Sequence, residues 1–285
     1  MKVREPQLAG SWYPDSSSAV KKTIASWSDY VSLTLRPQGR TVAAVVPHAG
    51  WVFSGKLAAR VLARAAESHK GDPPTLVVVL GGHLGPGDPL VVYEEEAWDT
   101  PLGPLRLDPA QNALLANFNQ FVWSGSTNDN TIEVLLPLVK FYFPEALLWP
   151  LRVPPAAAAG LLGETLYAIL RDRSEPALVV ASTDLTHYGQ AYGFAPAGPG
   201  QPGEEFRLQN DRAFIEAVLA LDPGRALAAG QKKKAACSAG AAAAAVQLAS
   251  LFKAKAIEVD SYASSDIMPG PQSVGYAGLE FVRVF

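Results

Sequence analysis

The sequence has one cysteine in 285 residues and almost no excess of charge, with 24 Lys and Arg against 27 Asp and Glu. A single cysteine excludes an internal disulfide framework and is typical of proteins in a reducing compartment. A net charge of −3 and a pI of about 5.8 exclude the basic surface with which proteins bind nucleic acid. The chain also lacks a run of about 18–20 apolar residues that would span a membrane, and its start lacks the apolar core of a signal peptide. We therefore expect a cytoplasmic protein that binds neither nucleic acid nor membrane.

Short apolar, β-branched runs alternate with segments of helical spacing. The runs at 41–46, 76–80 and 178–181 are typical of strands buried on both faces, as in a parallel sheet covered by helices. No repeat or linker divides the chain, so we expect residues 1–285 to form a single α/β domain with a mostly parallel central sheet flanked by helices. Helices are predicted at 16–32, 55–68, 109–118, 156–170, 204–221 and 238–253, and loops at 98–105 and 195–203.

Three of the four histidines directly follow such apolar runs. His48 comes after the first run, His83 after the second and His187 after the third, while His69 lies elsewhere. Ligands of parallel sheets bind outside the carboxyl ends of the strands. Each histidine by itself is more typical of a residue that caps a turn than of a ligand. Together they predict a metal site or an acid–base site at one edge of the sheet.

The single cysteine, Cys237, precedes the predicted helix at 238–253 and follows the run Lys232-Lys233-Lys234. A helix N-terminus and nearby cations both favour the thiolate, which is the form that binds metal. Two neutral imidazoles with one anionic ligand leave coordination positions open for water, dioxygen or substrate. The alternative is that Cys237 is a small buried residue at the start of an alanine-rich helix.

Asp184 and His187 form a second pair, three residues apart and just past a strand. In a helical turn this spacing places both side chains on one face. The carboxylate would then fix the tautomer of the imidazole, which suits a general acid or base. The alternative is that Asp184 caps a helix and His187 is an incidental surface residue.

Five ordered motifs give the chain a resemblance to a known family. From about residue 4 to the C-terminus it resembles the Memo family, whose bacterial and archaeal members are called AmmeMemoRadiSam system protein B. The closing segment Ser273-Val274-Gly275-Tyr276-Ala277 is also similar. The motifs are Ala9-Gly10-Ser11-Trp12-Tyr13-Pro14, Pro47-His48-Ala49-Gly50, Leu80-Gly81-Gly82-His83, Ser182-Thr183-Asp184-Leu185-Thr186-His187-Tyr188-Gly189 and Cys237-Ser238-Ala239-Gly240.

The resemblance implies a fold like that of class III extradiol dioxygenases, which hold Fe(II) with two histidines and a glutamate. It implies that His48, His83 and Cys237 are the metal ligands, with cysteine in place of the carboxylate. It also implies a catalytic pair, Asp184 and His187, with His187 as the acid–base group. Trp12 is implied to line the substrate pocket. The implied cofactor is one divalent metal ion, with Fe(II) favoured and Zn or Cu also compatible with a thiolate ligand.

The chain departs from the family pattern at two places. The segment Gly81-Gly82-His83 is one residue shorter than the usual Gly-Pro-Asn/Ser-His, and Asn130 replaces a family histidine. We expect the shorter segment to alter the pose of His83, and the lost histidine to affect the substrate more than the metal.

Two functions remain open from the sequence. The favoured one is a mononuclear non-haem iron or copper oxidoreductase, dioxygenase-like, acting on an unidentified small molecule. The alternative is a zinc-dependent hydrolase or a non-catalytic binding protein that keeps the pocket. The name of the system further implies a functional link to radical SAM and AMMECR1-like proteins.

Overall fold

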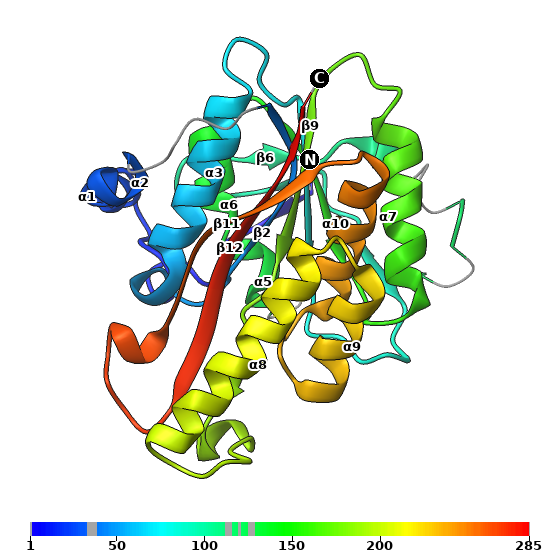
Figure 1. Cartoon of the computed structure of the whole chain (residues 1–285). Helices are drawn as coiled ribbons and strands as arrows, with labels where there is room; N and C mark the ends of the chain where they lie inside the picture. Colours follow the sequence, from blue (N-terminus) through cyan, green and yellow to red (C-terminus); the bar gives the residue numbers. More distant parts are fainter. Residues whose placement is uncertain (1, 33–38, 112–115, 119–120, 125–128, 285) are drawn as a thin grey trace.

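A computed structural model describes residues 2–32, 39–111, 116–118, 121–124 and 129–284. Its strands and helices build one large sheet with helices on both faces, and a small second sheet near the N-terminus (Figure 1). The strands are β1 (Val3–Arg4), β2 (Arg40–Val46), β3 (Leu76–Gly81), β4 (Leu90–Tyr93), β5 (Ala97–Trp98), β6 (Leu105–Arg106), β7 (Phe121–Ser124), β8 (Leu147–Arg152), β9 (Ala177–Ser182), β10 (His187–Tyr188), β11 (Lys255–Ala263) and β12 (Ser273–Arg283). The helices are α1 (Ser17–Ser26), α2 (Ser28–Ser32), α3 (Lys56–Ser68), α5 (Asn130–Glu133), α6 (Leu136–Tyr142), α7 (Ala157–Leu170), α8 (Gln201–Leu219), α9 (Pro223–Lys233) and α10 (Ala239–Leu251). Short helical turns are η1 (Trp51–Gly55), η2 (Pro109–Gln111), η3 (Gln190–Tyr192) and η4 (Ser264–Asp266).

The large sheet has a parallel centre and antiparallel flanks. Its strand order is β10-β12-β2-β9-β3-β8-β4-β7, with β11 paired to β12. Strands β2, β9, β3 and β8 run parallel, whereas β12 pairs antiparallel with β2, and β4 with β8. The mostly parallel, helix-flanked sheet predicted from the sequence is therefore confirmed, and the strands that carry the histidine motifs lie in its parallel centre.

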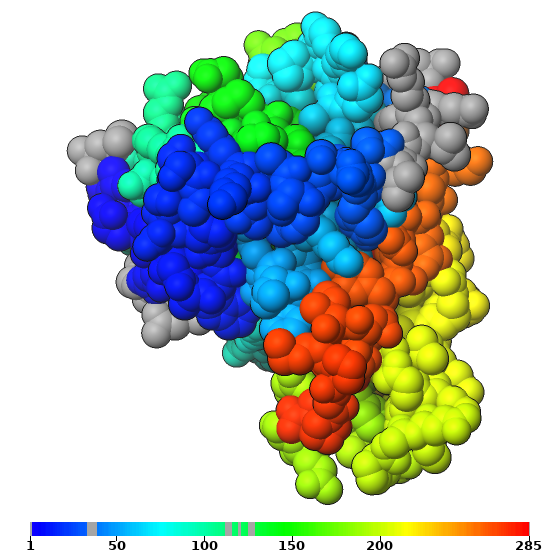
Figure 2. Space-filling view, turned by 90° about the vertical axis from the view of Figure 1, so that its left-hand side faces the viewer, coloured from blue at the N-terminus to red at the C-terminus, as the bar shows by residue number. Residues whose placement is uncertain are grey.

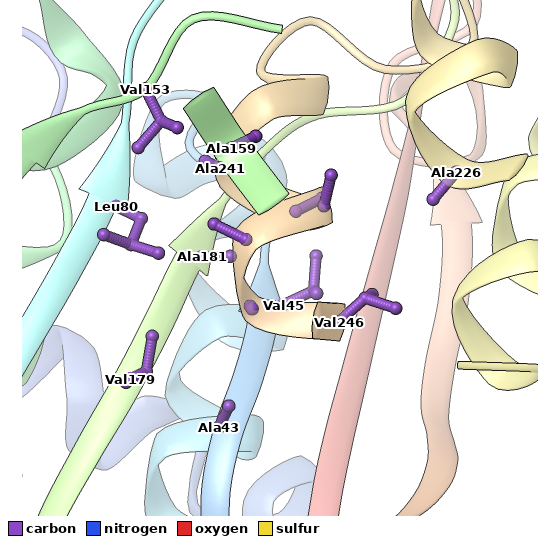
Figure 3. Packing of buried hydrophobic residues seen from close by; sticks show 14 of the residues in the cluster. Ala43, Val45, Leu80, Val153, Ala159, Val179, Ala181, Ala226, Ala241 and Val246 are labelled. Carbon is purple, nitrogen blue, oxygen red and sulfur yellow. The ribbon is translucent and has the colours of Figure 1, made fainter. Parts of the chain in front are cut away.

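Both faces of this centre are buried, which explains why its strands are continuously apolar. Side chains alternate between faces along a strand, so Ala43 and Val45 of β2 belong to one core cluster and Ala44 and Val46 to the other. Helices α7 to α10 cover the first face and helices α1 and α3 the second. Figure 3 shows α10 crossing the strands, with Ala241 and Val246 among the small strand residues Ala43, Val45 and Ala181.

The alanine-rich helix α10 packs closely against α7 because both helices present small residues. A Cβ added at Gly163 of α7 would lie 2.5 Å from the carbonyl oxygen of Ala244 in α10. Real Cβ atoms do not approach a backbone oxygen so closely, so the glycine permits the contact. At the start of α10, near Cys237, a Cβ at Gly240 would lie 2.4 Å from the carbonyl oxygen of Val153, so the helix begins in equally close contact with the chain after β8.

The N-terminal segment lies on the surface beside two segments that are distant in sequence. Figure 2 shows it in blue, on the same face as the segment that follows β2 and the orange-red segment near residues 264–272. Strand β1 pairs with β5, and β5 with β6, in the small sheet. The segment 98–105, predicted as a loop, therefore begins and ends in strands that hold the N-terminus.

Three other predicted boundaries are wrong. The helix expected over 16–32 breaks at Trp27, whose ring packs on Trp51 with centroids 5.4 Å apart. The helix expected over 109–118 is a 3₁₀ turn, Pro109–Gln111, and residues 112–115 lie outside the described residues. The loop expected over 195–203 ends at Gln201, where α8 begins, and Tyr188 holds it through the carbonyl of Gly198.

Among the described residues, no helix is both long enough and apolar enough to cross a membrane.

Candidate metal centre

The strand order brings the sequence motifs together. Strands β2, β9 and β3 are neighbours in the sheet, and the chain leaves the carboxyl ends of these three strands toward His48, Asp184 and His83 respectively. In register, Val46 of β2 lies beside Ser182 of β9. Segments more than a hundred residues apart in sequence therefore meet at one edge of the sheet.

His48 is fully buried and held at both ends. Its backbone N–H donates to Oδ1 of Asp184 over 2.7 Å, and its ring Nδ1 lies 2.8 Å from Oγ of Ser182. A hydrogen bond at Nδ1 leaves Nε2 free to act as a ligand atom. Burial, and next the charge of His83, lower the pKa of His48 to about 3. The imidazole is therefore neutral at physiological pH.

His83 follows two glycines that the local geometry requires. A Cβ at Gly81 would lie 2.4 Å from Oγ1 of Thr131, and Gly82 has a φ of +111°. The Gly82 N–H donates to Thr131 Oγ1 over 2.7 Å, and the His83 N–H donates to Asp129 over 3.3 Å. The shortened segment thus delivers an exposed imidazole across the edge of the sheet.

Cys237 lies in the connection between α9 and α10. Its N–H donates to the carbonyl of Asp184 over 3.1 Å, and its Sγ accepts from the Asp184 N–H over 3.3 Å. Reciprocal bonds of this kind fix the thiol beneath the turn after β9. The lysines of the run 232–234 are exposed, and Nζ of Lys234 lies over the ring of Phe194, 5.2 Å from its centroid.

The three side chains place ligand atoms at metal-site distances. Nε2 of His48 is 3.2 Å from Nε2 of His83 and 3.2 Å from Sγ of Cys237, and all three atoms lie within 4.8 Å of one another. Around a tetrahedral ion with bonds of about 2.0–2.3 Å, neighbouring ligand atoms are about 3.3–3.6 Å apart. The two spacings of 3.2 Å from His48 Nε2 are close to this value, and the three atoms form a group that could hold an ion.

The pKa of Cys237 corrects one expectation from the sequence. Burial, and next the carboxyl of Asp184, raise the pKa of the thiol to about 12, while hydrogen bonds from Thr183 and the Asp184 N–H act against this rise. The helix start and the lysine run do not produce a thiolate in the protein without a cation. A bound cation would have to displace the proton.

Asp184 and His187 are close together, but not on a helix. The chain between β9 and β10 is irregular, and the two side chains lie 3.9 Å apart between Oδ2 and Nε2. This distance exceeds a hydrogen bond, and Nε2 of His187 is buried without a partner. Burial raises the pKa of Asp184 and lowers that of His187, and each group opposes the shift of the other. Both shifts favour the neutral forms.

One cavity of about 1120 Å³ contains these groups. His48, His83, Asp184 and His187 line it, together with Trp12, whereas Cys237 does not. The thiol is half-buried and contacts Nε2 of His48, which lines the cavity. Trp12 lies in the wall of this cavity. His69, the remaining histidine, is buried elsewhere, with Nε2 2.8 Å from the carbonyl oxygen of Thr41.

The sequence did not indicate which residues hold the ligand segments in place. Ser182 orients the ring of His48, and Asn130 donates from Nδ2 to the carbonyl of His48 over 3.1 Å. Asp129 pairs with Arg152 at 2.9 Å and caps α5. Although burial alone would raise the pKa of Asp129, hydrogen bonds from Thr131 and the charge of Arg152 lower it. Asp is common directly before a helix, so the sequence could have indicated Asp129 as a helix cap. Nothing in the sequence indicated its contact with His83.

The turn that carries His187 is fixed from α8. Asp211 accepts the N–H of Thr186 over 2.9 Å, and Asn210 donates to Oγ1 of Thr186 over 3.0 Å. Arg207 pairs with Asp211, and all three α8 residues are buried. No signal in the sequence pointed to this network, because a buried polar triplet on a helix looks like an ordinary solvated face.

Comparison with known proteins shows similarity along almost the whole chain. The sequence profile described as Memo-like protein matches residues 4–280. A MEMO1 family protein of Pyrococcus horikoshii is 28% identical over 98% of this chain and 99% of its own length. Another, from Thermococcus onnurineus, is 32% identical over 68% of both chains. The crystal structure of an uncharacterised Escherichia coli protein superposes with a TM-score of 0.52, covering 84% of this chain and 99% of that one at 13% identity, which shows a shared fold.

Proposed function

The chain belongs to the Memo-like family, and from this premise we propose that it binds one divalent metal ion at His48, His83 and Cys237 and uses it in redox chemistry on a small molecule. The observation that carries the proposal is the spacing of 3.2 Å from His48 Nε2 to each of the other two ligand atoms. At this spacing the two imidazole nitrogens and the sulfur converge on one point, as the ligands of a single ion do. Fe(II) is the favoured ion.

The donor set fits such an ion chemically. An ion held by three protein ligands keeps positions open and, when bound, supplies a Lewis acid that binds and activates dioxygen, water or an oxidisable substrate. His48 and His83 line the cavity, so a substrate would approach the ion from the cavity. Ser182 and Asp129 hold the two histidine segments in place before the ion binds.

We assign proton transfer to His187, with Asp184 beside it. The buried, unpartnered Nε2 of His187 is available to a substrate in the cavity. Its lowered pKa keeps the imidazole neutral, which is the form able to take a proton from a bound hydroxyl. Asp184 binds the His48 N–H and so links the proton-transferring residue to the ligand segment. Trp12 is assigned to the wall of the substrate site.

A zinc-dependent hydrolase is the second candidate. A thiolate with two imidazoles suits Zn²⁺ as well as Fe(II) or Cu, because sulfur is a soft ligand. In this case His187 would take the proton of a metal-bound water rather than that of a substrate hydroxyl. The observation in its favour is the ligand set itself, two imidazoles and one cysteine sulfur within 4.8 Å of one another.

Metal analysis of protein purified anaerobically without added metal tests the proposal. We expect about one ion per chain in the parent, and loss of that ion in His48→Ala, His83→Ala and Cys237→Ser. His187→Ala is the matched control and should retain the ion, since it removes an imidazole of the same cavity outside the ligand set. Retention of metal by all three ligand variants would overturn the site.

The identity of the ion decides between the two candidates. Iron as the ion that copurifies, with dioxygen uptake restored by Fe(II) and not by Zn(II), supports the redox function. Zinc that copurifies and supports hydrolysis of small ester or amide probes supports the hydrolase instead.

A further inference from the structure

The cavity in front of the candidate metal centre has an unusual concentration of exposed apolar surface. Four large apolar side chains on it are partly or largely exposed: Trp12 at 38%, Tyr192 at 45%, Met268 at 61% and Val52 at 70%. They come from four separate segments of the chain. Soluble proteins seldom expose such side chains together unless the surface binds something.

Aromatic rings make up much of the wall. Three of the six tryptophans, Trp12, Trp27 and Trp51, line the cavity. Trp27 and Trp51 pack against each other, with centroids 5.4 Å apart, so they back the wall rather than offer free faces. Trp12 and Tyr192 are the exposed rings, and the ring of Tyr192 packs edge-on against His187 at 5.1 Å. An aromatic surface therefore leads directly to the assigned proton-transferring residue.

The charged groups that line the cavity also restrict what it can bind. Among the described residues, neither a lysine nor an arginine lines the cavity, and Asp184 is its single carboxyl group. A phosphate, sulfonate or carboxylate placed away from the metal would lose its hydration without gaining a cationic partner, which is costly. An uncharged ring avoids this cost, and a cationic group gains from aromatic faces.

The wall is also built to stay in place. Oε1 of the buried Glu133 accepts the N–H groups of Gln7 and Leu8, each over 2.7 Å, and the hydroxyl of Tyr13 over 2.9 Å. The carbonyl of Trp12 accepts the N–H of Trp51 over 2.8 Å. Trp12 thus stands on a segment anchored on both sides, as expected for a binding wall rather than a loose tail.

We infer that the substrate of this site is an uncharged or positively charged molecule with a flat ring system larger than one benzene ring. The ring system lies against Trp12 and Tyr192, and a polar end reaches His48 and His83. The inference rests on the proposed function in placing a metal at that end. The size follows from the volume of about 1120 Å³, since pockets for drug-sized ligands are about 300–1,000 Å³.

Three naphthalene probes of different charge test this inference: 2-naphthol, 2-naphthylmethylamine and naphthalene-2-sulfonate. Their affinities are measured by calorimetry at neutral pH, on the metal-loaded parent and on metal-free Cys237→Ser. We expect the neutral and cationic probes to bind at least tenfold more tightly than the sulfonate in both samples. Phenol, with one ring, should bind more weakly than 2-naphthol. A sulfonate that binds as tightly as 2-naphthol would overturn the charge selectivity.

Substitutions at two tryptophans locate the binding wall. Trp12→Ala should weaken 2-naphthol binding about tenfold, whereas Trp12→Phe, which keeps a ring, should lose much less. Trp123→Ala is the matched control, because Trp123 is similarly exposed at 42% but lies on β7, away from the cavity, and it should bind as the parent does. Unchanged binding in Trp12→Ala, or equal losses in both alanine variants, would contradict the inference.

These measurements distinguish a failure of the metal-site proposal from a failure of the substrate-class proposal. Metal content is read on every variant, and Trp12→Ala should retain its ion. Loss of probe selectivity with normal metal content contradicts the substrate class alone. Normal probe binding in a parent that takes up no metal contradicts the metal site alone.

Discussion

Sγ of Cys237 lies 3.2 Å from Nε2 of His48, although 189 residues separate the two in sequence. The contact joins the start of α10 to the end of β2, across the top of the parallel sheet. It places a half-buried thiol of raised pKa against a neutral imidazole, and Nε2 of His83 lies 3.2 Å from the same nitrogen. Binding of a cation to these residues should therefore release a proton, which can be measured.

Metal binding should release about one proton per ion, because the thiol is protonated below its pKa of about 12 and the ligand is the thiolate. His48 adds none, since its pKa of about 3 keeps it neutral above that value. Apparent affinity should therefore rise with pH, by about tenfold per unit while one proton is displaced. Calorimetry in buffers of different ionisation enthalpy measures the proton count. An affinity independent of pH would exclude Cys237 as a ligand.

The same thiol should react with alkylating reagents in a metal-dependent way. Bound metal should protect Cys237 from iodoacetamide, and a chelator should expose it. Since it is the single cysteine, mass spectrometry of the whole chain reads the modification directly. Equal rates of alkylation with and without metal would show that the sulfur is not bound.

Asp211→Ala should destabilise the protein by ~3–5 kcal/mol, because it leaves the buried guanidinium of Arg207 without its buried partner. Glu204→Ala removes the other partner of Arg207, which is 39% exposed, and should cost less than ~1 kcal/mol. Urea unfolding compares the two. Since Asp211 also binds the Thr186 N–H, hydrogen exchange of residues 184–188 should speed up in Asp211→Ala and not in Glu204→Ala. Similar effects of the two variants would show that Asp211 does not hold this turn.

Glu133→Ala should loosen the segment that carries Trp12. The substitution removes the acceptor of two backbone N–H groups and of the Tyr13 hydroxyl, at a cost of ~1–3 kcal/mol. Hydrogen exchange at residues 7–14 should increase, while metal content stays at the parental value. Tyr13→Phe removes one of the three donors and should have a smaller effect. Unchanged exchange in Glu133→Ala would show that Glu133 does not hold this segment.

Two glycines in α7 should respond oppositely to alanine. Gly163→Ala places a methyl group 2.5 Å from the carbonyl oxygen of Ala244 and should destabilise by ~1–3 kcal/mol. Gly160→Ala meets nothing within 4 Å and should stabilise by about 1 kcal/mol, the helix propensity difference. Chemical unfolding of both variants checks the packing of α7 on α10. The same sign of change for both would contradict it.

Local patterns predicted the parallel centre well, because strands buried on both faces must be continuously apolar. The predictions of helices and loops failed where a tertiary contact overrides the spacing of apolar residues along the segment. The break at Trp27 serves the packing of its ring on Trp51, and the strand pairs of the small sheet have only two residues each. Helix α9 was missed, because its last turn is the lysine run that resembled a surface loop.

The sequence by itself determined the strands at the centre of the sheet, the edge of the sheet at which the histidines lie, and the family. Each of these depends on a short continuous stretch of sequence. The tertiary structure decided which of those stretches meet. Strand order β2-β9-β3 places His48 and His83 on either side of the turn at Asp184, and α10 brings Cys237 beneath that turn. It also decided the charge state of the thiol, because burial outweighs the helix start and the distant lysines. Strand order and burial depend on the packing of the whole chain, and no local pattern encodes them.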